Sequence, residues 1–307
     1  MGAGTARSGS GADPRDAWFR VERVQDRMLT VALGLLAPLV LAFLLFHMLW
    51  GIVVAGLLFP VLPAAACNFL IRFWSRLLLA GLGIRLEFED LGGASRPPPA
   101  GSPGALLLTN HVSWADVFVL AAVIPVRFVA KSEVRSWPLA GWLAKAVGTV
   151  FIERGRRHAV SDVNRVVAAR LERGQPIAVF PEGTTTDGSA VLRFHANLVH
   201  AALVTGAAVV PVALKYWQDE RPSCAAAYVG DTSLAESLWR ILVAPRLRVQ
   251  LQLLPAVARA EGTRQEIARE AREAICVALG LPETDAVPVQ GAEDEIDAIE
   301  PSAPRGS

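Results

Sequence analysis

The sequence predicts an α/β fold, in which a mixed, largely parallel sheet is flanked by helices and preceded by an N-terminal hydrophobic helical hairpin. Three observations carry this prediction. Short apolar runs alternate with helical patterns, residues 28–71 form one long uncharged segment, and 307 residues are enough to build a sizeable core. With 52% hydrophobic residues and a mean hydropathy of +0.37, part of the chain is expected to meet lipid.

The uncharged segment 28–71 is 44 residues long, whereas one bilayer span needs about 20 residues and a signal-peptide core about 7–15. It can cross twice or enter and return, because breakers lie inside it at Gly51, Gly56, Pro60 and Pro63. Arginines precede and follow the segment, which predicts that both of its ends stay on the cytoplasmic side. We assign residues 28–66 to a membrane hairpin; a buried helical hairpin of a soluble core is the alternative.

Six short apolar runs after the hairpin are predicted to be buried strands. They are Ala105–Thr109, Val126–Ala130, Val150–Ile152, Ile177–Phe180, Ala208–Leu214 and Leu247–Leu254. Helical patterns separate these runs. Because a helix that connects two strands brings them side by side in the same direction, the sheet is expected to be largely parallel.

Two of the predicted helices have recognisable ends. One begins at Ser161 and is closed by Gly174, which stands where a terminating glycine belongs. The other begins with a capping box of Thr263 and Glu266 and is closed by Gly280. These ends complete a globular domain over residues 67–280. Residues 1–27 are assigned to an N-terminal tail and residues 281–307 to a disordered acidic tail.

Composition excludes several classes of protein. Lysine and arginine number 30 against 29 acidic residues, so no global field is available to hold nucleic acid. The three cysteines are far apart and form no CxxC pair, which excludes zinc ribbons and thioredoxin-type sites and favours buried, reduced thiols in the cytoplasm. Lipase elbow, P-loop and H-E-x-x-H motifs are absent from the sequence, and no metal site or bound cofactor is expected.

The first segment that can carry chemistry is residues 110–116, NHVSWAD, which follow the predicted strand 105–109 and precede a helical pattern. Ligands collect at such strand-to-helix loops. His111 and Asp116 can meet only if the histidine precedes the helix and the aspartate lies in its first turn. The aspartate then fixes the imidazole tautomer, and the other ring nitrogen can take a proton from a hydroxyl. Ser113 and Asp116 also match a capping box, so spacing alone leaves a purely structural role open.

Two further segments carry groups suited to an anionic ligand. Residues 180–188, FPEGTTTDG, offer glycines, hydroxyls and backbone amides, and Glu182 can accept a bond from a substrate hydroxyl or from a neighbouring amide. Residues 148–157, GTVFIERGRR, place three arginines after a strand, where they can clamp a phosphate or carboxylate. A solvated polar loop and a solvated charge cluster are the respective alternatives.

Together these segments resemble the lysophospholipid acyltransferase family, of the 1-acyl-glycerol-3-phosphate acyltransferase type. The resemblance rests on four motifs in the family's order: N-H-x-x-x-x-D at residues 110–116, G-x-x-F-I-x-R at 148–154, F-P-E-G-T at 180–184 and a proline-containing block at 209–214. The match covers residues 68–256. It implies the glycerolipid acyltransferase fold, with residues 67–280 as the catalytic domain behind the hairpin.

The resemblance also implies a mechanism. His111 is expected to be the general base that deprotonates the acceptor hydroxyl, and Asp116 to orient the ring and stabilise the imidazolium. The hydroxyl then attacks the thioester carbonyl of acyl-CoA or acyl carrier protein directly, without an acyl-enzyme, metal or cofactor. The residues expected to bind substrate are Glu182, Gly183 and Thr184 for the acceptor, Arg154 for its phosphate, and Lys131 and Asn110 beside them.

The expected reaction is acylation of 1-acyl-glycerol-3-phosphate to phosphatidic acid, in phospholipid biosynthesis at the cytoplasmic side of a bacterial inner membrane. Many members carry arginine after F-P-E-G-T, where this chain has Thr185, and often F-K shortly afterwards, where it has Phe194-His195. These two positions therefore lack the cation that contacts the phosphate in many members. Lys131, Arg193 or the arginines within 154–157 are the candidates to replace it. Acylation of a lyso-ornithine lipid or another lysophospholipid is therefore the first alternative. A non-catalytic lipid-binding protein and an acyl-thioester hydrolase are the others.

Overall fold

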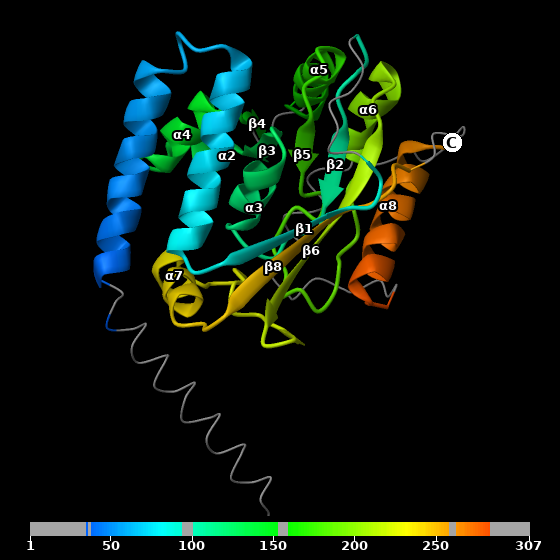
Figure 1. Cartoon of the computed structure of the whole chain (residues 1–307). Coiled ribbons are helices and arrows are strands. Elements are labelled where there is room, and N and C mark those ends of the chain that lie inside the picture. The colour runs from blue at the N-terminus through cyan, green and yellow to red at the C-terminus, as the bar shows by residue number, and fades with distance from the viewer. Residues whose placement is uncertain (1–34, 36–37, 94–100, 153–158, 258–261, 283–307) are drawn as a thin grey trace, which may run out of the picture.

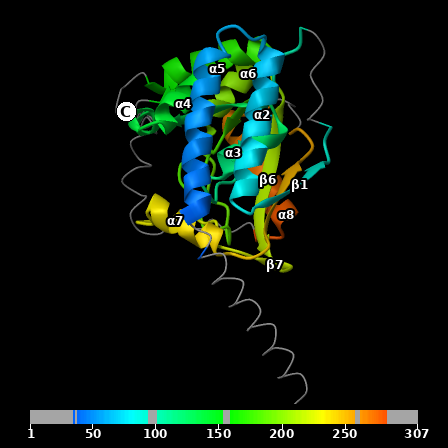
Figure 2. The same cartoon turned by 60° about the vertical axis from the view of Figure 1, so that its left-hand side comes forward.

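The computed structural model describes residue 35 and residues 38–93, 101–152, 159–257 and 262–282. The predicted tails, 1–27 and nearly all of 281–307, lie outside this part of the chain. Within it, an eight-stranded mixed sheet carries helices on both faces, and a helical hairpin lies along one side (Figures 1 and 2). The predicted fold class is confirmed.

The sheet has the strand order β1-β8-β6-β2-β5-β3-β4, with β7 paired to β6. Neighbouring strands are parallel, except that β6 runs antiparallel to both β7 and β8. The strands are β1 (Arg85–Asp90), β2 (Leu106–Thr109), β3 (Arg127–Lys131), β4 (Val150–Ile152), β5 (Ile177–Val179), β6 (Val209–Gln218), β7 (Arg221–Pro222) and β8 (Leu247–Leu253).

All six predicted strands are present close to their expected bounds. Strand β1 was not predicted, because the predicted strands were continuous apolar runs. The sequence of β1, RLEFED, instead has two apolar residues among four charged ones. It lies at the sheet edge, where its Glu87 pairs with Arg248 of β8 at 3.1 Å. Charged side chains on an edge strand discourage pairing with another chain.

The helices are α2 (Ala64–Gly81), α3 (Asp116–Val123), α4 (Ala140–Ala146), α5 (Ala159–Glu172), α6 (Val199–Thr205), α7 (Leu234–Leu242) and α8 (Arg264–Leu279). Helices α2, α3 and α7 share one hydrophobic cluster with one face of the sheet, and α5, α6 and α8 share a second cluster with the other face. Short 3-10 turns cover Ser132–Ser136 and Ala196–Leu198.

Three of the four predicted helix ends are present, whereas α5 begins at Ala159 and not at the predicted Ser161. Thr263 Oγ1 accepts the amide proton of Glu266, whose carboxylate accepts the amide proton of Thr263, so the capping box of α8 is complete. Gly280 closes α8 in the left-handed conformation at φ 67°, and Gly174 follows α5 at φ 73°. Each of these helix ends depends on residues that are close together in the sequence, so the sequence alone is enough to predict it.

The helical hairpin consists of an apolar helix, Pro38–Leu57, and α2, joined by a turn over residues 58–63. In the described residues, only Pro38–Leu57 is long and apolar enough to cross a membrane; it has 20 residues and a mean hydropathy of 2.3. The turn contains the predicted breakers Pro60 and Pro63. Gly51 lies inside the first helix instead, where a side chain would meet the indole of Trp74.

The second arm of the hairpin extends beyond the predicted boundary at residue 66, because α2 runs to Gly81. Its residues Leu78 and Leu79 are buried in the core of the globular domain. Trp74 of α2 stacks on His47 of the first helix, with ring centroids 4.4 Å apart. Each of these two side chains also hydrogen-bonds the backbone carbonyl of the other at 3.1 Å. The hairpin is therefore packed onto the globular domain rather than joined to it by a linker.

Two of the three cysteines are buried as predicted, Cys67 in α2 and Cys276 in α8. Cys224 is exposed, which corrects the prediction that all three are buried thiols. It lies in the loop between β7 and α7, where connecting segments run over the surface.

The capping box predicts the stability effect of one substitution. Thr263→Ala removes the side-chain acceptor of the Glu266 amide and is expected to cost about 1 kcal/mol of unfolding free energy. That loss lowers Tm by about 2–4 °C in thermal unfolding followed by circular dichroism in detergent micelles. Thr263→Ser keeps the hydroxyl and serves as the control. Equal Tm values for the two variants would contradict a stabilising role of this cap.

Candidate active site

The candidate site lies at the carboxyl edge of the parallel part of the sheet. Strands β2, β5, β3 and β4 are neighbours in that order and point the same way. His111 follows β2, Glu182 follows β5, and Lys131 ends β3. The carboxyl ends of parallel strands are where α/β folds bind ligands. The fold thus gathers two of the predicted segments and Lys131 at one edge.

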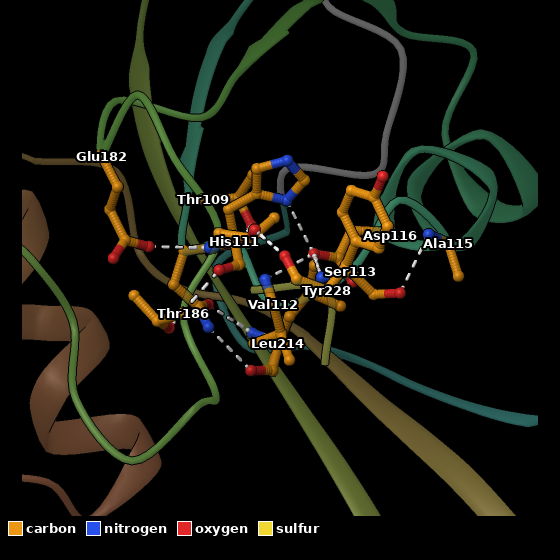
Figure 3. A network of polar contacts seen from close by, with 12 residues as sticks. Thr109, His111, Val112, Ser113, Ala115, Asp116, Glu182, Thr186, Leu214 and Tyr228 are labelled. Atoms are coloured by element: carbon orange, nitrogen blue, oxygen red, sulfur yellow. Dashed lines mark hydrogen bonds and ion pairs between the residues drawn. The ribbon is translucent and has the colours of Figure 1, made fainter. Parts of the chain in front are cut away.

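His111 and Asp116 meet as the sequence predicts. His111 precedes α3, and Asp116 is the first residue of that helix. The imidazole Nδ1 lies 2.9 Å from Asp116 Oδ2 (Figure 3). The His111 side chain is 19% exposed, and among the described residues no hydrogen bond involves its Nε2. With Nδ1 held by the carboxylate, Nε2 is the nitrogen that can take a proton.

Asp116 is fully buried, and its two carboxylate oxygens accept hydrogen bonds from four groups. Besides His111, Oδ2 accepts the backbone amides of Val112 at 2.8 Å and Ser113 at 2.9 Å. Oδ1 accepts the hydroxyl of Tyr216 at 2.7 Å. A buried charge is stable only when it is paired and hydrogen-bonded, and these donors meet that need. Asp116 therefore also orders the loop that carries His111, but the predicted capping box with Ser113 is not formed, since α3 begins after Ala115 without a side-chain cap.

Tyr216 was not predicted as a site residue. It lies on β6, 100 positions from Asp116, on the part of the strand beyond the predicted range 208–214. Burial raises the pKa of the Tyr216 phenol well above its usual 10.0, so its hydroxyl stays protonated and keeps donating to Asp116. The only sequence signal is the apolar strand itself, which says nothing about a phenol pointing at a carboxylate.

The side chains of Asn110 and Glu182 form hydrogen bonds with backbone groups of the protein. Asn110 is buried; its Nδ2 donates to the carbonyl of Leu214 at 2.9 Å, and its Oδ1 accepts the Leu214 amide at 2.8 Å. Glu182 Oε1 accepts the amide of His111 at 2.7 Å, and Oε2 accepts the amide of Leu192 at 2.8 Å. Both were predicted to bind substrate, and a neighbouring amide was the alternative partner for Glu182. That alternative is realised, since the polar atoms of both residues hold backbone around the loop that carries His111. Substrate binding by either residue stays a prediction.

A buried arginine of α8, which was not predicted as a site residue, supports the segment that contacts Glu182. Arg272 Nε donates to the carbonyls of Val191 and Leu192 at 3.0 Å, and its Nη2 donates to Val191 at 2.8 Å. The Leu192 amide in turn donates to Glu182, which accepts the His111 amide. Burial nevertheless raises the pKa of Glu182 to about 8, because desolvation outweighs these hydrogen bonds and the nearby arginine.

The loop after Glu182 wraps around His111. The Thr186 amide donates to the carbonyl of His111 at 2.8 Å, and the ring of Phe180 stacks on the imidazole with centroids 3.8 Å apart. Gly183 has φ +72° and lies close to His195; Thr184 follows it and is half-buried. The Thr185 hydroxyl donates to the backbone carbonyl of Tyr228. Thr185 thus fastens the loop to the neighbouring segment.

The cations of the site are described only in part. Lys131 is half-buried at the end of β3, with Ile152 of β4 beside it in register. Arg154 and the arginines that follow it lie outside the described residues. In the described ranges no group of three or more His, Cys, Asp and Glu side chains could hold a metal ion. The placement of Arg154 near a phosphate therefore stays a prediction.

The raised pKa of Glu182 predicts a pH dependence of stability. Unfolded, the carboxyl titrates near 4.5, whereas in the fold its pKa is about 8. Between these values the folded protein holds the proton more tightly, so the contribution of Glu182 is complete below pH 4.5 and is lost as pH rises to about 8. Glu182→Gln removes this titration. We expect the Tm of the parent chain to fall relative to that of Glu182→Gln across this window; parallel Tm curves would contradict the raised pKa.

Comparisons with known proteins identify relatives of this chain. A model of the family described as Acyltransferase matches residues 93–215. The lyso-ornithine lipid O-acyltransferase of Pseudomonas aeruginosa is 41% identical over 210 residues, which cover 68% of this chain and 78% of the relative. The 1-acyl-sn-glycerol-3-phosphate acyltransferase of Neisseria meningitidis is 38% identical over 177 residues, which cover 58% and 67%.

A solved structure supports the fold. The crystal structure of the 1-acyl-sn-glycerophosphate acyltransferase from Thermotoga maritima matches with a TM-score of 0.53 at 19% identity, over 84% of this chain and 96% of that one. At this identity the likeness concerns the fold alone. The family follows from the sequence relatives and from the motifs around His111 and Glu182. The chain is an acyltransferase and belongs to the lysophospholipid acyltransferase family.

Proposed function

We propose that this chain transfers a fatty acyl group from an acyl thioester to the free hydroxyl of a lyso-lipid, with His111 as the general base. One observation carries the proposal: Nδ1 of a partly exposed histidine lies 2.9 Å from a buried carboxylate, while Nε2 is left for substrate. A base of this kind contributes typically 10²–10⁴-fold to a rate.

The reaction runs in one displacement. Nε2 of His111 takes the proton of the acceptor hydroxyl as the oxygen attacks the thioester carbonyl. The new ester bond forms, the carbon–sulfur bond breaks, and the proton passes from the imidazolium to the leaving thiolate. Asp116 stabilises the imidazolium while its other three donors hold it still. Acyl-CoA and acyl carrier protein both supply the thioester that this step needs.

For the acceptor, we favour a lyso-ornithine lipid over 1-acyl-glycerol-3-phosphate. The hydroxyl of Thr185 donates a hydrogen bond to the Tyr228 carbonyl. At the position where many family members carry a phosphate-binding arginine, this chain thus has a side chain that holds the loop in place. An amino-acid headgroup carries no phosphate to be neutralised at that place. The P. aeruginosa relative named for lyso-ornithine lipid acylation also matches over more of its length than the N. meningitidis relative. Acylation of 1-acyl-glycerol-3-phosphate is the second candidate, with Lys131 and Arg154 as its cations.

We further propose that the hairpin lies along one leaflet of the inner membrane, with the catalytic domain on the cytoplasmic side. One side of α2 is buried in the domain core through Leu78 and Leu79, and the other side exposes Phe69 and Phe73. A helix with one side in protein cannot be surrounded by lipid. The arginines that flank the segment favour the cytoplasmic side for its ends.

Thiol release from the acyl donor tests the function. The purified chain is given acyl-CoA or acyl carrier protein as donor, with lyso-ornithine lipid or 1-acyl-glycerol-3-phosphate as acceptor. We expect acceptor-dependent release with the higher kcat/KM for lyso-ornithine lipid. His111→Ala is expected to lower kcat by about 10²–10⁴-fold.

Each other outcome excludes one part of the proposal. Release without any acceptor would make the chain a thioester hydrolase. Turnover with 1-acyl-glycerol-3-phosphate alone would keep acyl transfer and overturn the acceptor. A His111→Ala variant with near-parental kcat would overturn the general base.

Tyr216→Phe tests the hydrogen bond behind the base. The substitution removes one of the four donors to Asp116, and kcat is expected to fall about tenfold, equivalent to ~1.4 kcal/mol, with little change in the acceptor KM. Tyr228→Phe is the matched control, since Tyr228 contacts the site through backbone atoms. Equal kcat values for the two variants would show that the Tyr216 hydroxyl does not support catalysis.

A further inference from the structure

Arg272 is a buried charged residue on a helix that lies across the sheet from the catalytic motif. The residue is 7% exposed, and α8 packs on the face of the sheet opposite to α3, the helix that begins with Asp116 (Figure 1). Burying a guanidinium is costly, and a hydrophobic side chain of similar volume often stabilises a fold equally well. A buried arginine is therefore explained by what its donors hold rather than by its packing.

The donors of Arg272 hold a segment that has no helix or strand of its own. Residues 184–195 are irregular, and Val191 and Leu192 are buried within them. Buried backbone carbonyls outside helices and sheets need other hydrogen-bond partners. Nε of Arg272 donates to both of these carbonyls at 3.0 Å, and Nη2 donates to that of Val191 at 2.8 Å. The planar guanidinium thus fixes two successive peptide groups at once.

Leu192 connects this anchor to the catalytic motif. Its carbonyl accepts from Arg272, and its amide donates to Glu182 Oε2 at 2.8 Å. Oε1 of the same carboxylate accepts the amide of His111 at 2.7 Å. Burial raises the pKa of Glu182, and the positive charge of Arg272 opposes that rise, which favours the carboxylate form that accepts both amides. Arg272 therefore acts on the backbone of His111 through hydrogen bonds and through its charge.

We propose that Arg272 is a positioning residue for catalysis, which acts through Leu192 and Glu182 on the loop that carries His111. The inference rests on the proposed function, since the anchor serves the reaction only if His111 is the base. Without the guanidinium, the Leu192 carbonyl loses its donor, and the two amides no longer meet one fixed carboxylate. A misplacement of about 1 Å caused by a distant substitution can cost about 100-fold in rate.

Nuclear magnetic resonance tests the positioning without any turnover. The full chain carries isotope-labelled histidine in detergent micelles, and the His111 amide is assigned by its loss in His111→Ala. Arg272→Met is compared with Arg269→Met, the matched control, because Arg269 lies one turn earlier on α8 and pairs with Glu273 at the surface. We expect the His111 amide proton to move upfield in Arg272→Met, as its hydrogen bond to Glu182 weakens, and to keep the parental shift in Arg269→Met.

Thiol release then tests whether this position matters for the reaction. In Arg272→Met we expect kcat to fall about 10–100-fold with little change in the acceptor KM, whereas Arg269→Met keeps the parental kcat. Glu182→Gln replaces one acceptor oxygen by an amide group and so breaks the same connection. If Arg272 acts through Glu182, adding Arg272→Met to Glu182→Gln lowers kcat little further, whereas independent effects multiply.

Two results would overturn the proposal. One is a parental shift of the His111 amide in folded Arg272→Met; if that variant does not fold, Arg272→Lys replaces it, because lysine keeps the charge but lacks the fork that spans two carbonyls. The other is a loss of kcat that multiplies fully with that of Glu182→Gln, which would give Arg272 a role in stability alone. The amide shift needs neither donor nor acceptor. A failure of the proposed acyl transfer, seen as a parental chain without thiol release, is therefore distinguishable from a failure of this inference.

Discussion

The buried carboxylate of Asp116 is the group on which the rest of the site depends. Removing a charge from water is costly unless donors replace the lost solvent, and four donors do so here. Two of them are successive amides of the loop after β2, one is the imidazole of His111, and one is the phenol of Tyr216 on β6. The arrangement that supplies donors to the carboxylate therefore also folds the loop, docks it on the sheet and orients the imidazole of His111. A shift in any of these segments would leave a buried charge short of a donor.

Further hydrogen bonds connect the loop that carries His111 to the far side of the sheet. Asn110 ties the start of the loop to Leu214 on β6, and Glu182 ties the His111 amide to Leu192. Arg272 then holds the Leu192 segment from α8, the helix packed on the opposite face. The site is thus supported by backbone hydrogen bonds from separate parts of the chain. Such support is what holds a reacting base within the small tolerances that catalysis needs.

The parts of this structure that could be predicted are those whose cause is local. Apolar runs predicted six strands, and the Thr263 capping box predicted the start of α8. The spacing of His111 and Asp116 allowed their contact, and the resemblance of residues 110–116 to a family motif predicted it. Tyr216 and Arg272 escaped prediction because their partners lie 100 and 81 positions away, and only the strand order brings them together. The backbone contacts of Asn110 with Leu214, and of Glu182 with the amides of His111 and Leu192, could not be assigned from the motifs for a related reason. A motif shows that a polar residue matters, but it does not show whether its atoms face the substrate or the backbone.

The way the hairpin is attached suits an enzyme whose acceptor is a lipid. A flexible linker would hold the domain near a membrane but would let it turn, and the base would then meet acceptor hydroxyls at every orientation. Here α2 shares its buried residues with the domain, and aromatic contacts run from His47 through Trp74 and Phe118 to Trp114. With the hairpin in the membrane as proposed, this packing sets the direction in which the domain faces lipid. Because His111 and Trp114 belong to one loop, the packing that orients the domain also orients the proposed base relative to the lipid that carries the acceptor hydroxyl.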